Sequence, residues 1–463
     1  MMRRFMAFGL ALAGMMIPLT AHGQAEGEAS AESWRDRLAD ADFEVQPYGT
    51  AVLNIVHNSG KPAPTAEAPV AAVLGSGYDD EIPGQGSLTL SARQSRFGLR
   101  AAASWDESAR AESTIEFDLW GLNESNGPGT ITQTTIRLRH AFFRIGNERV
   151  RLLAGQHWSV VTPRLPTSHG HMAVALHTAS GAIWNRLPQL TLELDAPMGE
   201  SLLTWRLSVA RPQSGDGARN ILRTDQPDPG ALSQMPYLQT RVALKTDSVE
   251  VGLAGHVGQE TYERATGIET APGFRAGEVR YDEVDVMTWL VSADLRATMG
   301  PMWLQGQAWA GANVNGLFGR HGVLIDMWDA NDTFSAAALS GEIRDVESVF
   351  GMGGWGELGV GLGDSGLSLV SSFGIETGDE EDVDYGQSYE SWNAFGGLLY
   401  KPVSWFDVSA EYLYSRTFYR PDLEYRELPG YRVDNDPLRG QAPPTRMRRG
   451  QNNSIALTTR LRF

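Results

Sequence analysis

Apolar and charged residues alternate with a period of two over residues 93–163, in four successive segments. The apolar side of these segments consists of Phe97, Leu99, Ala101, Ile115, Phe117, Leu119, Ile136, Leu138 and Phe142. The charged side consists of Arg96, Arg100, Glu112, Glu116, Asp118, Arg137 and Arg139. Because successive side chains of a β-strand point to opposite faces, the pattern predicts four strands with one apolar and one charged face.

The same alternation recurs through the rest of the chain and ends in the last segment, SIALTTRLRF. Short turns and long loops alternate between the segments. A soluble sheet with one polar face is one interpretation of such strands. A barrel with lipid outside and water inside also explains the regular change between short turns and long loops. We therefore predict an all-β fold, a closed antiparallel transmembrane β-barrel of about 16 strands over residues 43–463.

The first residues, MMRRFMAFGLALAGMMIPLTAHGQA, have the three parts of a signal peptide. Arg3 and Arg4 form a basic region, residues 5–17 are apolar, and small residues up to Ala25 offer a cleavage site. We assign residues 1–25 to a signal peptide and residues 26–42 to a short periplasmic N-terminal segment. No later apolar run reaches the roughly 18 residues that a spanning helix needs. We expect a multi-pass barrel in the outer membrane of a Gram-negative cell.

Composition excludes some function classes. The chain contains no Cys, so disulfide bonds and thiolate chemistry are excluded. Without Arg3 and Arg4, 37 basic residues stand against 56 acidic ones, a net charge of −19. This charge argues against nucleic acid as a partner. It does not determine the charge of a pore, because the total says nothing of where the charges lie. No cofactor is expected.

The last strand ends in an aromatic residue, Phe463, which lies on the same side as Ile455, Leu457 and Leu461. This ending resembles the assembly signal of outer-membrane barrels, so we expect the barrel-assembly machinery to bind Phe463. Aromatic residues near the predicted turns also indicate a girdle at the membrane interfaces. The predicted girdle residues are Trp105, Trp205, Trp289, Trp303, Tyr400, Trp405 and Phe406.

A barrel of about 16 strands leaves an aqueous lumen, which a loop must narrow if solutes are to be selected. Residues 159–184 follow the fifth predicted strand, and we predict that they fold inward as a constriction loop. This loop contains basic residues and histidines but no carboxylate. The candidate constriction and solute-binding residues, from the loop and the wall, are Arg96, Arg100, Arg137, Arg139, Arg164, His169 and His171.

Inward arginines predict selection of anions, because a guanidinium group binds a carboxylate through two hydrogen bonds and low-dielectric walls focus the field. We therefore predict passive or facilitated diffusion of small hydrophilic solutes, anions of the carboxylate type in particular. The alternative is that the wall arginines pair with Glu112, Glu116 and Asp118 on the intervening strand. The barrel would then be a general, non-selective diffusion channel.

Four other interpretations fit the residues less well. The motif His169-Gly170-His171, with His177, offers imidazoles to zinc or copper. Without Cys or a carboxylate in the loop, we predict a polar or pH-responsive loop and no metal site. A hydrolase lacks support because there is no GxSxG motif, and we predict no catalytic residue. A structural or adhesive barrel has no use for inward arginines. A plugged energy-coupled transporter needs about 22 strands and a longer chain.

Four motifs within residues 93–163 resemble the corresponding run of the DcaP-like outer-membrane porins. They are QSRFGLRA, STIEFDLWG, RLRHAFFRIG and LLAGQHWS, and His157 stands where the family motif usually has Thr. The resemblance implies a sixteen-stranded trimeric porin that favours anionic organic solutes such as dicarboxylates. It also implies contact with the lipid and lipopolysaccharide of the outer membrane. Beyond residue 163, only the architecture and the terminal Phe463 are similar.

Overall fold

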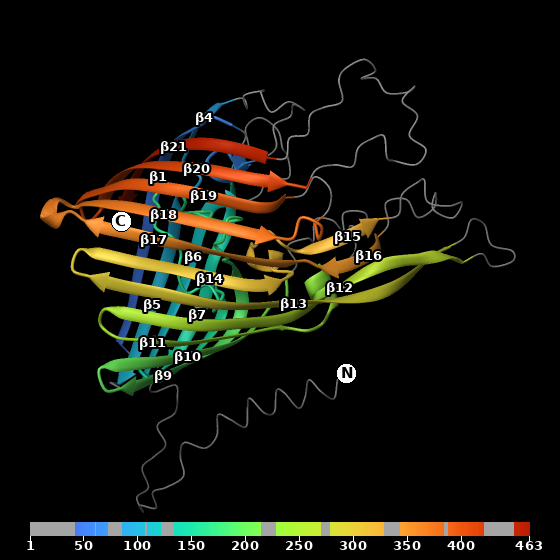
Figure 1. Ribbon diagram of the computed structural model, residues 1–463. Coiled ribbons are helices and arrows are strands. Elements are labelled where there is room, and N and C mark those ends of the chain that lie inside the picture. The colour runs from blue at the N-terminus through green and yellow to red at the C-terminus, as the bar shows by residue number, and fades with distance from the viewer. Residues whose placement is uncertain are drawn as a thin grey trace, which may run out of the picture. The chain divides into compact units, whose positions relative to one another are not determined.

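The chain forms an antiparallel β-barrel, seen from the side in the computed structural model of Figure 1. The structure describes residues 42–60, 62–72, 86–106, 109–121, 134–213, 228–269, 278–327, 343–383, 388–420 and 449–463. The predicted signal peptide and all but the last residue of the predicted segment 26–42 lie outside the described residues.

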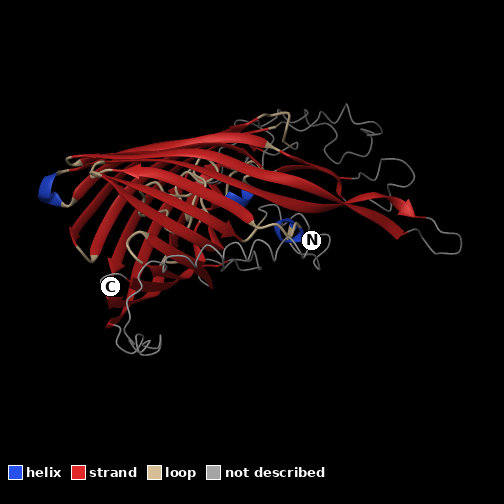
Figure 2. Ribbon diagram, turned by 90° about the horizontal axis from the view of Figure 1, so that it is seen from below, coloured by secondary structure: helices blue, strands red, loops and turns tan. Residues whose placement is uncertain are grey.

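Sixteen antiparallel strands form the closed wall, as the sequence pattern predicts, and strands dominate the view in Figure 2. In chain order they are β1 (Asp42–Asn58), β4 (Ser87–Ser91) with β5 (Arg96–Asp106), β6 (Ala109–Gly121), β7 (Thr135–Gly146), β8 (Val150–Trp158), β9 (Arg186–Met198), β10 (Ser201–Ala210), β11 (Tyr237–Lys245), β12 (Val249–Glu269), β13 (Glu278–Met299), β14 (Met302–Ala312), β17 (Phe350–Gly361), β18 (Leu367–Gly378), β19 (Ser388–Val403), β20 (Phe406–Tyr419) and β21 (Arg449–Arg462). β4 and β5 count as one wall strand because both pair with β1.

The barrel is closed by its first and last strands. β1 pairs with β21 from Thr50 opposite Arg462 to Asn58 opposite Ser454. Beyond this register, the backbone N–H of Gly49 donates to the carbonyl of Phe463 over 3.0 Å. Pairing of this kind leaves no free sheet edge, which hydrocarbon does not tolerate because it offers the backbone no hydrogen-bond partner.

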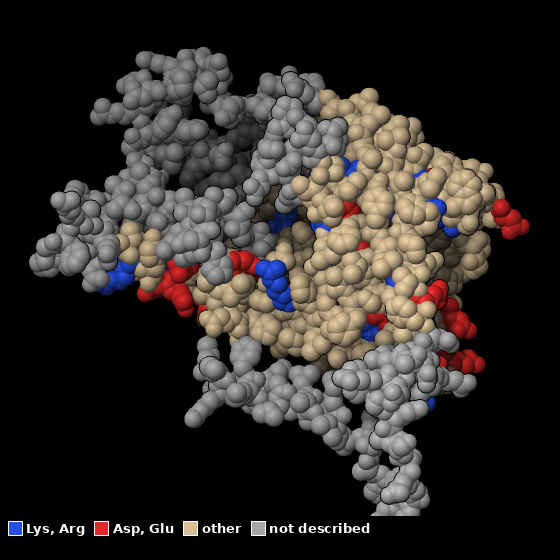
Figure 3. All heavy atoms as spheres, turned by 180° about the vertical axis from the view of Figure 1, so that it is seen from behind, with Lys and Arg blue, Asp and Glu red and all other residues tan. Residues whose placement is uncertain are grey.

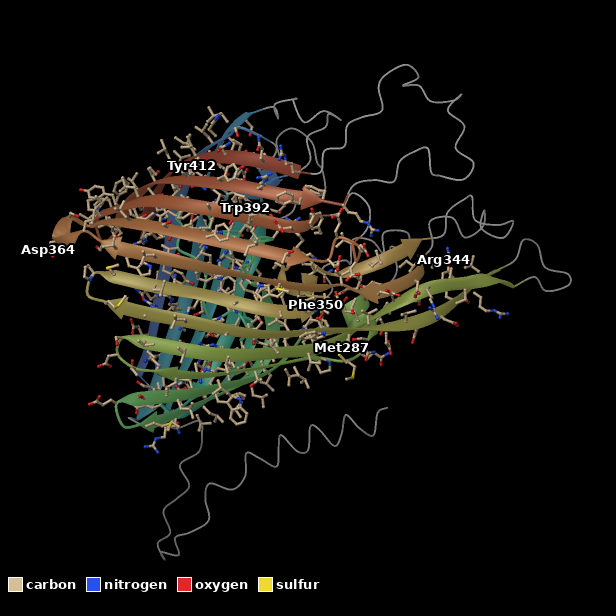
Figure 4. The ribbon with its side chains drawn as sticks, in the orientation of Figure 1. Met287, Arg344, Phe350, Asp364, Trp392 and Tyr412 are labelled. Atoms are coloured by element: carbon tan, nitrogen blue, oxygen red, sulfur yellow. The ribbon has the colours of Figure 1, made fainter. Side chains whose placement is uncertain are left out.

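Apolar side chains cover the outside of the wall. The alternation assigns Leu99, Phe117, Leu138, Leu192, Leu207 and Leu461 to the lipid side. Leu192 is half-buried, and the other five are between 38% and 45% exposed. In Figure 4 the side chains of Phe350, Trp392 and Tyr412 belong to this outer layer. Figure 3 shows mostly uncharged atoms on the described face, with carboxylates gathered along its edge. Charged residues that are buried on the inner side of the strands complete the alternation.

A β-bulge in β7 overturns one predicted orientation. Glu116 pairs with His140 but Phe117 pairs with Leu138, so Arg139 is an extra residue in the ladder. Such an insertion shifts the parity of the strand beyond it. Phe142, predicted on the lipid side, therefore lies inward beside His157, with ring centroids 4.6 Å apart. Its neighbour Phe143 is 53% exposed and takes the outward position.

The predicted aromatic girdle is partly correct. Trp205, Tyr400 and Trp405 are exposed on the outside of the barrel, near the short turns. The prediction for Trp303 is wrong. Its side chain lies inside the barrel, where the indole Nε1–H donates to Glu357 over 2.8 Å. A buried indole N–H needs such an acceptor.

Three features lie outside the regular wall. β12 and β13 extend beyond the other strands, and the hairpin of β15 (Val323–Met327) and β16 (Ile343–Ser348) packs against this extension through Tyr262 and Val286. A second hairpin, β2 (Pro62–Thr65) with β3 (Ala68–Ala72), forms within the loop after β1. Short helical turns are α3 (Pro229–Leu232), η2 (Asn315–Leu317) and η4 (Gly363–Ser365). Among the described residues, no helix is long and apolar enough to cross a membrane.

The orientation of β5 is tested by placing an arginine on either side of this strand. Leu99→Arg puts a charge on the lipid side, at a cost of about 2–4 kcal/mol near the middle of the bilayer. Ala102→Arg is the control, because position 102 faces the lumen and pairs with Glu112. We expect Leu99→Arg to lower the yield of folded, heat-modifiable barrel and Ala102→Arg to leave it near the wild-type level. Equal yields would show that the two faces of β5 are assigned incorrectly.

Candidate functional site

A long segment between β8 and β9 lies inside the barrel. Residues 159–185 leave the wall after Trp158 and rejoin it at Arg186, and most of their side chains are buried. On the way they bind residues of β13, β14, β17, β18, β19 and β20, which belong to the opposite part of the wall. The structure thus places the predicted constriction loop against the lumen side of these strands.

Two buried wall carboxylates hold the first half of the loop. Glu411 on β20 accepts hydrogen bonds from the backbone N–H of His169 at 2.7 Å and from the Ser168 hydroxyl at 2.6 Å. Glu357 on β17 accepts from both the N–H and the hydroxyl of Thr167, at 2.5 and 2.8 Å. Charge-assisted bonds of this type are about twice as strong as neutral ones. The loop, which has no carboxylate of its own, is therefore fixed by those of the wall.

The second half of the loop rests on small wall residues. The His177 ring binds Ser372 at 2.7 Å and also contacts the Asn393 side chain. The Ser180 hydroxyl lies 2.9 Å from that of Ser391. At Gly374 on β18, a Cβ atom would come within 2.7 Å of His177 Cγ, so glycine is required for this close approach.

Three of the predicted site arginines bind the loop from the β5–β7 wall. Arg96 donates to the carbonyl of Met172, and Arg137 donates to that of Ala173 over 2.9 Å. Arg139 reaches Met172 as well, at 3.4 Å. These guanidinium groups therefore border the loop, but they also fix its backbone in place.

The wall arginines on β7 are paired with carboxylates. Arg137 binds Asp118 through two hydrogen bonds, of 3.0 and 2.5 Å. Arg139 lies 2.6 Å from Glu116 and 2.8 Å from Asp118, and Arg144 pairs with Glu112. This is the pairing with β6 that the sequence allowed as the alternative to free arginines.

The other predicted residues lie elsewhere along the lumen. Arg100 stacks on Tyr48, 4.2 Å from the ring centroid. Arg164 binds Glu250 and Asp294 on β12 and β13, at 2.8 and 3.3 Å. His169 lies 3.4 Å from Asp407, and His171 donates to the carbonyl of Pro69 in the β2–β3 hairpin. The candidate residues therefore lie at four separate places and do not form one ring.

His169 and His177 of the loop are neutral near pH 7. Burial, together with the charge of Arg460, lowers the pKa of His169 to about 4. Burial lowers the pKa of His177 to about 3. Arg164 is therefore the only permanent cation of the loop, and it is paired.

The described residues contain no group of three or more His, Cys, Asp and Glu side chains that could hold a metal ion.

The sequence analysis missed one arginine at the base of the loop. Arg186 is 9% exposed and stacks on Trp158 and Trp184, 4.6 and 5.4 Å from their ring centroids. It was missed because it lies between the irregular stretch 159–184 and the alternating pattern that begins at Pro188. Glu357 and Glu411 were also missed. Their parity places them in the lumen, but nothing local in the sequence shows that they bind a loop.

No family model matches the sequence, and no curated protein matches it. Solved structures do. The outer membrane channel DcaP of Acinetobacter baumannii is 14% identical, with a TM-score of 0.61 over 91% of this chain and 97% of that one. The outer membrane protein OmpT of Vibrio cholerae is 12% identical, with a TM-score of 0.51 over 91% and 98% of the two chains. The anion-selective porin from Comamonas acidovorans is 10% identical, with a TM-score of 0.50 over 91% and 100%.

At these identities the comparisons show a shared fold. The chain is a closed sixteen-stranded transmembrane barrel with the fold of outer-membrane porins. The resemblance of residues 93–163 to the DcaP-like porins is confirmed at this level, since a DcaP structure matches nearly the whole chain.

The close contact between the loop and β18 is tested by a substitution at Gly374. We expect Gly374→Ala to push His177 and Ser180 away from β18 into the lumen and so to lower the single-channel conductance, with the barrel still folded. Gly356→Ala on the neighbouring strand is the control, because a Cβ there would meet no atom within 4 Å. Unchanged conductance in a folded Gly374→Ala protein would show that the loop does not narrow the channel at this point.

Proposed function

We propose that the protein is an outer-membrane channel for passive diffusion of small hydrophilic solutes, with a preference for anions. The observation that carries the proposal is the excess of guanidinium groups where the loop meets β5–β7. The charges of Arg96, Arg137, Arg139 and Arg186 interact there, and the described carboxylates that interact most strongly with Arg96 and Arg186 are Glu116 and Asp118. Within this group of described residues, four positive charges stand against two negative ones, a local surplus of two.

The ion pairs decide which arginines can attract a solute. Asp118 and Glu116 are engaged by Arg137 and Arg139. Arg96 donates to a carbonyl, which does not neutralise its charge. Arg186 stacks on two indole rings, which do not neutralise it either. A surplus charge beside a low-dielectric wall attracts counter-ions more strongly than it would in water. The anion preference therefore depends on Arg96 and Arg186 more than on the β7 arginines.

A channel without selectivity is the second candidate. A network of alternating charges runs along β6–β10 on the inner wall, and its members are Glu112, Arg144, Glu193, Arg151, Asp195 and Arg206. Three arginines balance three carboxylates, so this part of the lumen attracts neither sign of ion. If this network determines the electrostatic potential of the lumen, the channel passes cations and anions equally.

Further partners follow from the resemblance and the fold. We propose a homotrimer in the lipid and lipopolysaccharide of a Gram-negative outer membrane, and recognition of Phe463 by the barrel-assembly machinery. The ring of Phe463 is 63% exposed, which leaves it open to such a partner. Transport needs neither catalysis nor energy coupling in this proposal. A native mass of one chain in mild detergent, at every concentration tried, would contradict the trimer.

Ion preference is measured as the reversal potential of purified channels in a planar bilayer under a KCl gradient. We expect the wild-type channel to favour chloride. Arg96→Gln removes a charge but keeps a donor for Met172, and we expect it to lower the chloride-to-potassium permeability ratio by up to about fivefold. This magnitude corresponds to the roughly 1 kcal/mol of one charge at 4 Å in water.

Arg206→Gln is the control for this experiment. Arg206 faces the lumen as well, but it belongs to the balanced network through Asp195, 2.7 Å away. We expect only a small change in the permeability ratio. A wild-type channel that favours potassium would contradict the proposed anion preference, and equal permeabilities would favour the non-selective channel.

A further inference from the structure

Arg186 is a buried cation without a carboxylate partner among the described residues. Its Nη1 atom is buried and has no hydrogen-bond partner in that part of the chain. The guanidinium group stacks on the rings of Trp158 and Trp184. A buried guanidinium group that lacks an acceptor is costly, because both its hydration and its hydrogen bonds are lost. The arrangement therefore favours an anion that supplies the missing acceptor.

The nearest charges cannot supply that acceptor. Arg139, Arg137 and Arg96 repel Arg186, and Asp118 is the carboxylate that attracts it. Asp118 already binds Arg137 and Arg139, at 2.5 and 2.8 Å. Its side chain is completely buried between them. A second carboxylate, brought by a solute, would meet a guanidinium group that no described wall residue neutralises.

Aromatic rings surround this cation on the loop side. Trp184 stacks on Phe318 with ring centroids 4.5 Å apart and nearly parallel planes, 21° from each other. Phe318 is 41% exposed, and it holds a positive φ of 58° at the end of η2. A left-handed conformation is unfavourable for a bulky residue and is found where the surrounding structure imposes it. Here it places an accessible ring directly on the indole that contacts Arg186.

We propose that Arg186, Trp184 and Phe318 form a subsite for aromatic monocarboxylates, with the carboxylate on Arg186 and the ring against Phe318. This inference rests on the proposed anion channel and names a solute class for it. One unneutralised guanidinium group matches one carboxylate, which it binds through two parallel hydrogen bonds. An offset or edge contact between the solute ring and Phe318 adds a preference over saturated rings. Binding stays weak enough for release, as conduction requires.

The test uses purified channels in planar bilayers, with benzoate as the probe and cyclohexanecarboxylate as a saturated acid of the same charge. Each acid is added to KCl, and the concentration that halves the chloride current is measured. We expect benzoate to act at a concentration several-fold lower than cyclohexanecarboxylate. Arg186→Gln should raise the half-blocking concentration of benzoate by about tenfold, as for the loss of hydrogen bonds to a charged group.

Two further variants distinguish benzoate binding at this subsite from a general electrostatic attraction of anions to the lumen. Arg186→Lys keeps the charge but loses the planar pair of donors, so chloride preference should persist while benzoate block weakens. Phe318→Leu removes an exposed ring. In this variant, benzoate and cyclohexanecarboxylate should halve the chloride current at similar concentrations. Arg206→Gln should leave the benzoate block as it is in the wild-type channel.

The outcomes distinguish this subsite from the proposed function. If the wild-type channel prefers potassium, the anion channel itself is contradicted, and the subsite with it. If it prefers chloride but benzoate blocks no better than cyclohexanecarboxylate, only the aromatic subsite is contradicted. Benzoate block that is unchanged in Arg186→Gln also contradicts the subsite, whatever the ion preference.

Discussion

The pairing of β1 with β21 is the constraint on which the rest of the structure depends. Inside a bilayer a free strand edge would leave several backbone groups without partners, each at a cost of several kcal/mol. The register from Thr50–Arg462 to Asn58–Ser454 removes both edges at once. With the wall closed and its outside apolar, every charged side chain of the strands must lie in the lumen or near the membrane surfaces. The charged side chains that can interact with a solute therefore lie inside the barrel.

Most of the internal charge stabilises structure and is not available to a solute. The carboxylates of Glu357 and Glu411 bind the constriction loop, and Asp118 binds two arginines of β7. Breaking such a buried pair by removing one partner leaves an uncompensated charge, which is strongly destabilising. Among the described residues near the loop, Arg186 has no carboxylate within ion-pair distance. In the proposed function, this guanidinium group binds the anion, because no structural ion pair has to be broken there.

The sequence predicted the wall better than the lumen, for a physical reason. Alternation is a local property, so the lipid-facing positions of Leu99, Phe117 and Leu461 could be read directly from the chain. A bulge is not visible in such a pattern, and the extra residue at Arg139 turned Phe142 inward. The partners of the inward charges depend on contacts between residues far apart in the sequence. Thr167 and Glu357, which are 190 positions apart, are an example.

Loops were the other source of error. The hairpin β2–β3, within the Pro-rich segment after β1, was not predicted from the sequence. This hairpin meets the constriction loop through Pro69 and His171. Prolines have no N–H to donate, so a strand such as Pro62–Thr65 is tolerated only because it pairs on one side, with β3. Arg186 was missed for a similar reason, since the irregular segment before it hid the start of β9.

The central claim is that residues 159–185 are fixed across the lumen, and one disulfide tests it most directly. The natural chain contains no Cys, so Ser180→Cys with Ser391→Cys introduces a single possible bond. The two hydroxyl oxygens lie 2.9 Å apart, one on the loop and one on β19. The account predicts that the bond forms on mild oxidation of the folded barrel and leaves the single-channel conductance unchanged. Free thiols in the oxidised, folded protein, or a conductance that falls when the bond forms, would contradict it.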